Sequence, residues 1–331
     1  MSSSAALCRE VCDQIRRHQR MVVTSHVRPD GDAIGSALAL AGALRAIGKD
    51  ARVINHDPVP EPLTEFPGTS DIIVAETVPA DTEAIVVLEC GDLERTGLKG
   101  LDDCTIINVD HHAGNSGYGE TRWFDATYAA VGEMVFEIIE ELGAPMTPDI
   151  ATQLFVAIVT DTGSFRFPGV SPRTFAMSGR LVAAGADPVL TAKRLYDSST
   201  LGRLRLQGAV LQSLEIVAAG RLALLHVDNV MMADAGATPE DTDGLINLPL
   251  SVNAIQVSVF FKQAGDGTYR VSLRSKDHID VGAVARGFAG GGHRNAAGCT
   301  IAGDFARVRE TVLARIMPEL TAHPVDDTTG E

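Results

Sequence analysis

Short apolar segments that end in acidic residues or histidines recur through the first half of this chain. One of them, Thr105-Ile106-Ile107, leads directly into Asn108-Val109-Asp110-His111-His112. The apolar run predicts a short buried strand, so the Asp-His-His triplet would lie at the end of that strand. Open parallel sheets bind their ligands beyond the carboxyl ends of the strands. The pattern therefore favours an α/β sheet with polar, ligand-binding strand ends.

Strand-like and helix-like segments alternate along this half of the chain. Strands are predicted at Met21–Thr24, Ala51–Asn55, Ile72–Ala75, Ala84–Leu88 and Thr105–Val109. Helices are predicted at Gly35–Ile47, Tyr128–Leu142, Pro148–Thr160 and Pro172–Ala184. Gly48 and Gly143 would end the first two helices, and Thr147 would cap the third. Such alternation predicts an α/β fold with a doubly wound, mostly parallel sheet.

The pattern changes in the second half of the chain. Residues 187–214 are helical in pattern and charged. Further on, strands are predicted at Arg221–Val227, Ala254–Lys262 and Tyr269–Arg274, and helices at Val281–Phe288 and Phe305–Met317. We therefore expect a first domain over residues 1–190, a helical linker over 191–214 and a smaller α/β domain over 215–331, with a cleft between the domains.

Composition limits the partners and the compartment. The formal net charge of -15 over 331 residues argues against sequence-independent binding of long nucleic acid, but not against a small anionic substrate. The five cysteines, Cys8, Cys12, Cys90, Cys104 and Cys299, are irregularly spaced and odd in number, which is not typical of a disulfide framework. No segment approaches the ~20 apolar residues of a membrane span. We expect a soluble protein of a reducing cytoplasm, with no membrane partner.

Four polar clusters supply carboxylate and imidazole groups. They are His26-Val27-Arg28-Pro29-Asp30-Gly31-Asp32, Leu88-Glu89-Cys90-Gly91-Asp92, Asp110-His111-His112, and Val159-Thr160-Asp161-Thr162-Gly163-Ser164-Phe165-Arg166. Three of them have a structural alternative: Asp32 as a helix N-cap and His26 as a core histidine, the second cluster as a solvated turn, and Asp161 as a buried capping residue. Adjacent residues do not share a face of a regular element, so only one of the paired histidines is expected to bind metal. Asp110 would orient an imidazole ring.

The four clusters together predict a two-metal site. Carboxylates gathered in one crevice repel each other at neutral pH, and divalent cations remove that repulsion. Two cations ~3.5–4 Å apart are a recurring device for displacement at phosphoesters. Aspartate with histidine, without paired cysteines, favours Mn²⁺ or Mg²⁺ over structural zinc, and the imidazoles favour Mn²⁺. Co²⁺ is a further option.

In this order and spacing the clusters resemble the DHH phosphoesterase family, and the resemblance covers nearly the whole chain. The second half adds Ser272-Leu273-Arg274-Ser275 and the run Gly290–Gly298, which look like the signature of the DHH-associated domain. The size and two-domain layout are most similar to the compact branch of bifunctional oligoribonucleases and pAp phosphatases (nano-RNases).

The resemblance implies a role for each matching residue in the first domain. His26 and Asp30 would bind one metal, and Asp32, His111 and Asp161 the other. Glu89 stands where the family has a bridging aspartate, so the bridge would fall to Glu89 or to Asp92. His112 would face the substrate phosphate with Asp110 behind it, and His112 or Arg166 would stabilise charge on the phosphoryl oxygens.

In the second domain the resemblance implies a substrate-binding surface. Its residues would be Arg274, Ser275, Gly290, Gly291, Gly292, His293, Arg294 and Asn295. Glycine lets backbone N–H groups approach an anion closely. The alternative for Arg274 is an ion pair with Asp277 or Asp280 that braces its own domain.

The expected activity is hydrolysis of short oligoribonucleotides to mononucleotides, removal of the 3′-phosphate of pAp, or both. One alternative is a phosphodiesterase for cyclic-di-AMP or pApA. Another, of a different class, is a metal-loaded nucleotide sensor without turnover. Long duplex nucleic acid is not an expected partner, and a homodimer remains open.

Overall fold

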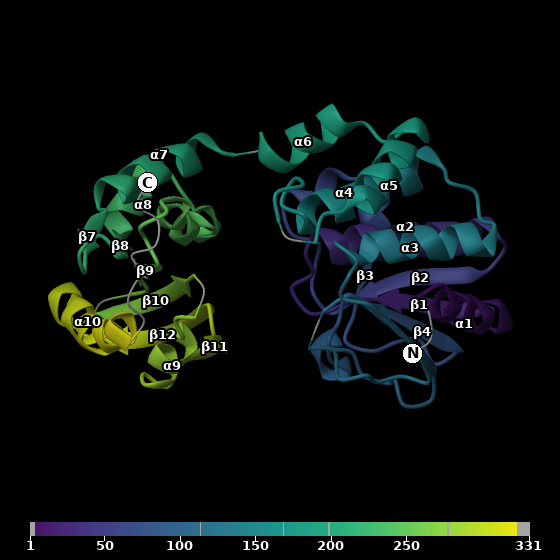
Figure 1. Ribbon diagram of the computed structural model, residues 1–331, viewed down its shortest axis with the longest axis horizontal. Coiled ribbons are helices and arrows are strands. Elements are labelled where there is room, and N and C mark those ends of the chain that lie inside the picture. The colour runs from purple at the N-terminus through teal and green to yellow at the C-terminus, as the bar shows by residue number, and fades with distance from the viewer. Residues whose placement is uncertain are drawn as a thin grey trace. The chain divides into compact units, whose positions relative to one another are not determined.

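The computed structural model describes residues 4–112, 114–167, 169–197, 199–265, 267–276 and 278–322. The chain divides into two compact units, Met1–Ser198 and Ser199–Glu331. The segment expected to form a single linker contributes one helix to each unit, α6 (Pro188–Tyr196) to the first and α7 (Leu201–Gln212) to the second (Figure 1). Helix α7 packs on strand β8 (Leu222–Val227) and helix α8 (Asn229–Ala235).

The first unit contains a six-stranded sheet in the order β3-β2-β1-β4-β5-β6, and each of its strand pairings is parallel. Its strands are β1 (Arg20–Thr24), β2 (Asp50–Asn55), β3 (Ile73–Val74), β4 (Ala84–Leu88), β5 (Thr105–Asp110) and β6 (Thr121–Phe124). The direction of winding reverses between β1 and β4, which confirms the predicted parallel α/β sheet. Strand β6 escaped prediction because only Thr121 and Trp123 of its four residues are buried.

The two faces of this sheet are covered differently. On one face, Val23, Val86 and Val109 pack in a core with the helices. These helices are α1 (Ser4–Arg17), α2 (Gly31–Ala46), α3 (Val131–Leu142), α4 (Pro148–Asp161) and α5 (Pro172–Ala183). On the other face, Ile85 and Val87 pack against residues of the connecting segments. Short 3₁₀ turns lie in these connections: η1 (Leu63–Glu65), η2 (Thr69–Asp71) and η3 (Leu93–Thr96).

Helices α2 and α4 pack closely because glycines face the contact. A Cβ atom added to Gly35 would overlap the carbonyl oxygen of Gln153, and one added to Gly31 would overlap Thr160. The predicted start of α2 at Gly35 is wrong by one turn, because Asp30 caps the helix by accepting a hydrogen bond from Ala33 N at 3.1 Å. The contact therefore brings the first turn of α2 beside the last turn of α4.

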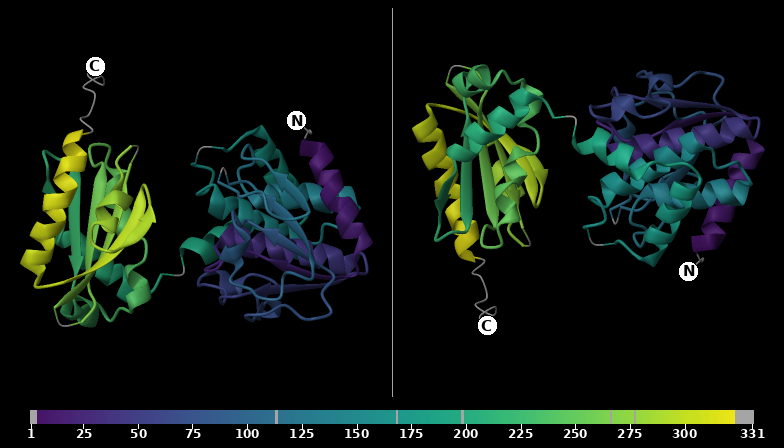
Figure 2. Two further views of the ribbon diagram at one scale, coloured as in Figure 1. Left: turned by 90° about the horizontal axis from the view of Figure 1, so that it is seen from below. Right: turned by 90° about the horizontal axis from the view of Figure 1, so that it is seen from above.

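The second unit is built on a mixed sheet in the order β11-β12-β10-β9-β8-β7, in which β8 and β9 are parallel and the other pairings antiparallel (Figure 2). Besides β8, its strands are β7 (Glu215–Val217), β9 (Val257–Gln263), β10 (Thr268–Ser275), β11 (Gly291–His293) and β12 (Ala296–Ala302). The glycine-rich run thus forms a β-hairpin.

Helices cover both faces of this second sheet. Helices α9 (Val281–Arg286) and α10 (Phe305–Ala322) share a core with Val271 and Leu273 of β10. Residues of α7, α8 and the turn η5 (Leu245–Asn247) pack around Phe260 on the opposite face. The remaining turns are η4 (Pro239–Thr242) and η6 (Pro249–Ser251). Among the described helices, none is long and apolar enough to cross a membrane.

Candidate metal centre

Four distant segments of the first unit bring ligand atoms together. Single ligand atoms of Asp32, Glu89, His111 and Asp161 all lie within 4.8 Å of one another, and so do those of Glu89, His111 and His112. Asp32 lies in the first turn of α2, Glu89 follows β4, the histidines follow β5, and Asp161 ends α4. The cluster therefore lies beyond the carboxyl ends of β4 and β5, beside the reversal of winding at β1, as the sequence predicts for this sheet class.

Glu89 lies at the centre of both groups. Its side chain is 1 % exposed, and its Oε2 atom accepts no hydrogen bond from any described residue. Its Oε2 lies 3.4 Å from His111 Nε2, and its Oε1 lies 3.5 Å from His112 Nε2. A buried carboxylate oxygen without a partner is costly, and a cation would satisfy it. The donor set therefore fits a metal ion.

The backbone at Glu89 is unusual as well. Its φ of 56° lies in the left-handed region, which costs free energy for a residue with a Cβ atom. Asp92, the alternative bridge, is exposed and accepts a hydrogen bond from Glu94 N at 3.0 Å at the start of η3. The geometry thus puts Glu89, and not Asp92, among the clustered ligands.

Asp32 is anchored by the start of a different helix. Its Oδ2 accepts a hydrogen bond from Val131 N at 2.6 Å, and its Oδ1 accepts one from Gly132 N at 2.9 Å. Asp32 therefore caps α3, whereas Asp30 takes the α2 capping role that was the alternative for Asp32. Burial raises the pKa of the Asp32 carboxyl well above its ordinary value, and the charge of Glu89 raises it further.

Both histidines are held by their Nδ1 atoms. His111 Nδ1 donates to the carbonyl oxygen of Tyr128 at 3.0 Å, which leaves Nε2 to face Glu89 and Asp161 at 3.4 and 3.3 Å. His112 Nδ1 donates to Asp110 Oδ1 at 2.9 Å, so Asp110 does orient an imidazole. Both rings face Glu89, because β5 ends at Asp110 and regular alternation ends with it. That only one of the two histidines binds metal stays a prediction.

The electrostatics of the cluster reflect crowded negative charge. Burial raises the pKa of Asp161 to about 6, and the charge of Glu89 adds to this effect. Burial lowers the pKa of His111, but its contacts with Glu89, the charge of Asp32 and the hydrogen bond to Tyr128 together outweigh burial and raise that pKa to about 10. The raised pKa values of Asp161 and Asp32 mean that these carboxylates resist ionisation, and the raised pKa of His111 means that its imidazole keeps its proton. Both shifts indicate a pocket that favours added positive charge.

His26 and Asp30 form a pair beside this cluster. His26 Nε2 lies 3.9 Å from Asp30 Oδ2, and His26 Nδ1 donates to Val27 O at 2.9 Å. The charge of Asp30 raises the pKa of both Asp32 and Asp161, so Asp30 adds to the same negative field. Neither residue belongs to the mutually close groups of described residues.

Arg166 is not among the clustered residues. Its guanidinium is exposed, and its Nε donates to the carbonyl oxygen of Gly163 at 2.6 Å. Sequence reasoning also missed Asn115, whose Nδ2 donates to Asp110 Oδ2 at 2.6 Å. No local pattern identifies Asn115, because the hydrogen bond depends on how the loop after β5 folds back.

The residues expected to bind substrate in the second unit have structural partners. Asn295 Nδ2 donates to Ser275 Oγ at 3.0 Å, and Ser275 Oγ donates to Ile279 O at 2.7 Å. Arg294 Nη2 donates to His278 O at 2.9 Å, so this hairpin turn braces the loop before α9.

Arg274 Nη1 donates to Leu273 O at 3.0 Å. Its alternative partner Asp280 instead caps α9 and lies 3.4 Å from Arg286. Asp277 and the side chain of His293 lie outside the described residues.

The three glycines of the hairpin differ in their surroundings. Gly292 has a φ of 136°, and a Cβ atom there would overlap Ala296 O. A Cβ atom on Gly290 would overlap Gly298 O, whereas one on Gly291 would have no neighbour within 4 Å. Gly290 and Gly292 are therefore required by the fold of the hairpin, and Gly291 leaves its backbone open.

Comparison with known proteins gives matches in both halves. The DHH family N-terminal domain matches residues 20–158, and the DHHA1 domain matches residues 224–317. The chain is 34% identical to the bifunctional oligoribonuclease and PAP phosphatase NrnA of Thermus thermophilus, over 90% of both chains. It is 27% identical to the protein of that name from Bacillus subtilis, over 88% of this chain and 92% of the relative.

Solved structures share the fold. An exopolyphosphatase-related protein from Bacteroides fragilis superimposes with a TM-score of 0.82 at 24% identity, covering 95% of this chain and 96% of that one. The exonuclease RecJ bound to manganese gives a TM-score of 0.54 at 15% identity, covering 96% and 95%. With the strand-end cluster, the two domain matches and the Thermus relative, the conclusion is that this chain belongs to the DHH family of phosphoesterases.

Proposed function

We propose that the protein is a metal-dependent hydrolase that cleaves short oligoribonucleotides to mononucleotides and removes the 3′-phosphate of pAp. The observation that carries this proposal is the buried Glu89 carboxylate, which faces both imidazoles and lacks a hydrogen bond at Oε2 within the described residues. The substrate classes come from the relatives, whose names specify oligoribonuclease and PAP phosphatase over about the whole length of this chain.

The donor set supports two divalent cations, with Mn²⁺ preferred and Mg²⁺ or Co²⁺ as alternatives. Asp32, His111 and Asp161 would hold one, His26 and Asp30 the other, and Glu89 would lie between them. When bound, such cations neutralise charge on a phosphoryl group and make water a better nucleophile at neutral pH.

The chain's own groups position the phosphate and the reacting water. Asp110 fixes the His112 ring through Nδ1, so His112 Nε2 is available to donate to a phosphoryl oxygen. Glu89 and Asp32 are buried, which strengthens the charge interactions that these two carboxylates make. We assign the chemistry to the first unit, and the binding of a second phosphate to the second unit through Arg274, Arg294 and the open backbone of Gly291.

A substrate panel tests the proposal. Full-length protein with Mn²⁺ would be assayed for product release from a diribonucleotide, from pAp and from cyclic-di-AMP. Turnover of the first two substrates supports the proposal. Preferred turnover of cyclic-di-AMP would reassign the substrate, and tight nucleotide binding without turnover would make the protein a sensor.

A further inference from the structure

Two cations face each other on neighbouring strands of the second unit. Strands β9 and β10 are antiparallel, and their register puts Lys262 directly opposite Arg270. Like charges in this position destabilise a sheet. Neither side chain forms an ion pair with any residue in the described ranges, although Lys262 Nζ donates to Thr242 Oγ1 at 3.3 Å. Within the described part of the chain, this pair of positive charges therefore has no acidic side chain bound to it.

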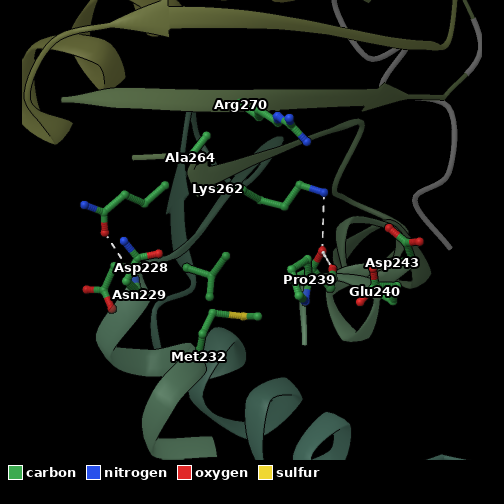
Figure 3. Close-up of a pocket in the computed structure, with 12 residues that line it drawn as sticks. Asp228, Asn229, Met232, Pro239, Glu240, Asp243, Lys262, Ala264 and Arg270 are labelled. Carbon is green, nitrogen blue, oxygen red and sulfur yellow. Dashed lines mark hydrogen bonds between the residues drawn. The ribbon is translucent and has the colours of Figure 1, made fainter. Parts of the chain in front are cut away.

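The cation pair lines two adjoining cavities. One cavity, of about 490 Å³, lies beside Ser272, Gly290 and Thr300, and the cation pair supplies the only charges among its described lining residues. The other, of about 440 Å³, is shown in Figure 3, where Lys262 and Arg270 extend from the sheet toward it. Asp228, Glu240 and Asp243 also line this cavity. An anion would therefore be favoured on the side of Ser272 and repelled on the side of the three acids.

Strand geometry relates this pair to Arg274. Val271 and Leu273 are buried in the core with α9 and α10, so Arg270, Ser272 and Arg274 share the opposite face of β10. Four residues of antiparallel strand span ~14 Å. A single strand whose phosphate contacts Arg274 would therefore reach the cation pair only with a phosphate further along its chain.

We propose that Lys262 and Arg270 form a distal phosphate subsite for the backbone of a single-stranded oligonucleotide. This inference rests on the proposed function, because it assumes that the ligand is an oligoribonucleotide. A phosphate bound there would neutralise the two cations. The acidic side chains of the neighbouring cavity would repel the phosphates of the oligonucleotide, so we expect its backbone not to continue past the subsite. Dinucleotides and pAp are too short to reach it, so it selects for length and not for the reacting phosphate.

Binding of defined RNAs to the chelated, full-length protein tests the subsite without turnover. The probes are oligoadenylates of two and six nucleotides, and the variant is Lys262→Gln/Arg270→Gln. Each lost phosphate contact is expected to weaken hexamer binding by roughly tenfold. Because single strands lose about 0.7 in salt slope per neutralised phosphate, the slope for the hexamer should fall by about 1.4. Dinucleotide binding should not change.

Arg205→Gln is the matched control, because Arg205 is an exposed arginine of α7 outside both cavities. The subsite is rejected if the double variant binds the hexamer as tightly as the unmodified protein does. It is also rejected if the dinucleotide is weakened as much as the hexamer, since the cations would then belong to the primary site. Failure of the proposed function is seen separately, as absent turnover of dinucleotide and pAp by the unmodified protein with Mn²⁺.

Discussion

Glu89 is the residue whose environment most needs an added cation. Its carboxylate is buried, its backbone is strained, and its nearest polar neighbours are two imidazoles and further carboxylates. The glutamate is one methylene longer than the aspartate that the family pattern implies. In this structure the left-handed backbone conformation of Glu89 accompanies a side chain that points into the cluster.

The first prediction concerns Glu89→Gln, with Asp92→Asn as the matched control on the same loop. Saturating a site at 100 times its Kd stabilises a protein by ~2.7 kcal/mol, so Mn²⁺ should raise the Tm of the unmodified protein. We expect this rise to be lost in Glu89→Gln and retained in Asp92→Asn, because Asp92 only caps η3. Differential scanning calorimetry with and without Mn²⁺ measures it. Equal Mn²⁺-dependent shifts in both variants would remove Glu89 from the ligand set.

At the scale of elements, the segment that leads into the first turn of α3 holds two candidate ligands at once. Tyr128 O accepts from His111, while Val131 N and Gly132 N donate to Asp32. The segment is clamped by Arg173, which donates to Thr127 O at 2.6 Å and lies over the Tyr128 ring at 3.6 Å. Arg173 also pairs with the fully buried Glu133 at 3.3 Å.

The second prediction follows from this clamp. Arg173→Met leaves the buried Glu133 charge without its partner, which should lower the free energy of unfolding by roughly 2–4 kcal/mol. Loss of such support typically weakens metal binding 10–100-fold, so Mn²⁺ affinity should fall within that range. Arg180→Met on the same helix removes an exposed pair with Glu140 and a contact with the Phe136 ring, but no buried ion pair, and should change both quantities little. Urea unfolding measures the change in stability, and Mn²⁺ titration measures the change in affinity. Unchanged Mn²⁺ affinity in Arg173→Met would show that the Arg173 contacts stabilise the fold without supporting the metal ligands.

The third prediction concerns the contact between α2 and α4. Gly35→Ala puts a Cβ atom against Gln153 O, and overpacking of this kind costs about 1–3 kcal/mol. The Cβ atom of Gly42→Ala, on the same helix, meets only the Ile150 side chain, with Cγ1 at 3.4 Å, and the variant gains up to ~1 kcal/mol of helix propensity. In urea unfolding, we expect the free energy of unfolding to fall in Gly35→Ala and to rise in Gly42→Ala. Mn²⁺ binding should weaken only in Gly35→Ala, because the contact between α2 and α4 sets Asp32 beside Asp161. An unchanged free energy of unfolding in Gly35→Ala would show that α2 and α4 can move apart without loss of stability.

At the scale of the whole molecule, the fourth prediction is metal dependence. Exhaustive chelation should abolish hydrolysis of both dinucleotide and pAp, and Mn²⁺ should restore both together, because one cluster serves both reactions. His111→Ala should not be restored by Mn²⁺. Full activity after chelation would contradict the two-metal interpretation, and recovery of only one activity would require a second site.

Long segments with strong periodicity were predictable from the sequence, including helices α2 to α5 and the apolar strands β1, β2, β4 and β5. The ligand types were predictable because each follows an apolar run. What sequence reasoning missed depends on contacts between distant residues. Asp32 caps a helix that begins about one hundred residues later, and the glycine-rich run pairs with itself as β11 and β12.

The Asp32 contact with α3 also has a consequence for the order of assembly. The start of a helix carries about half a positive charge, and that charge is covalently part of the chain. Asp32 therefore keeps a compensating partner whether or not any ion has been captured. Folding and metallation are then separable events: the polypeptide can mature first and acquire its ions afterwards. Cellular metal supply would in that case control the activity of the enzyme.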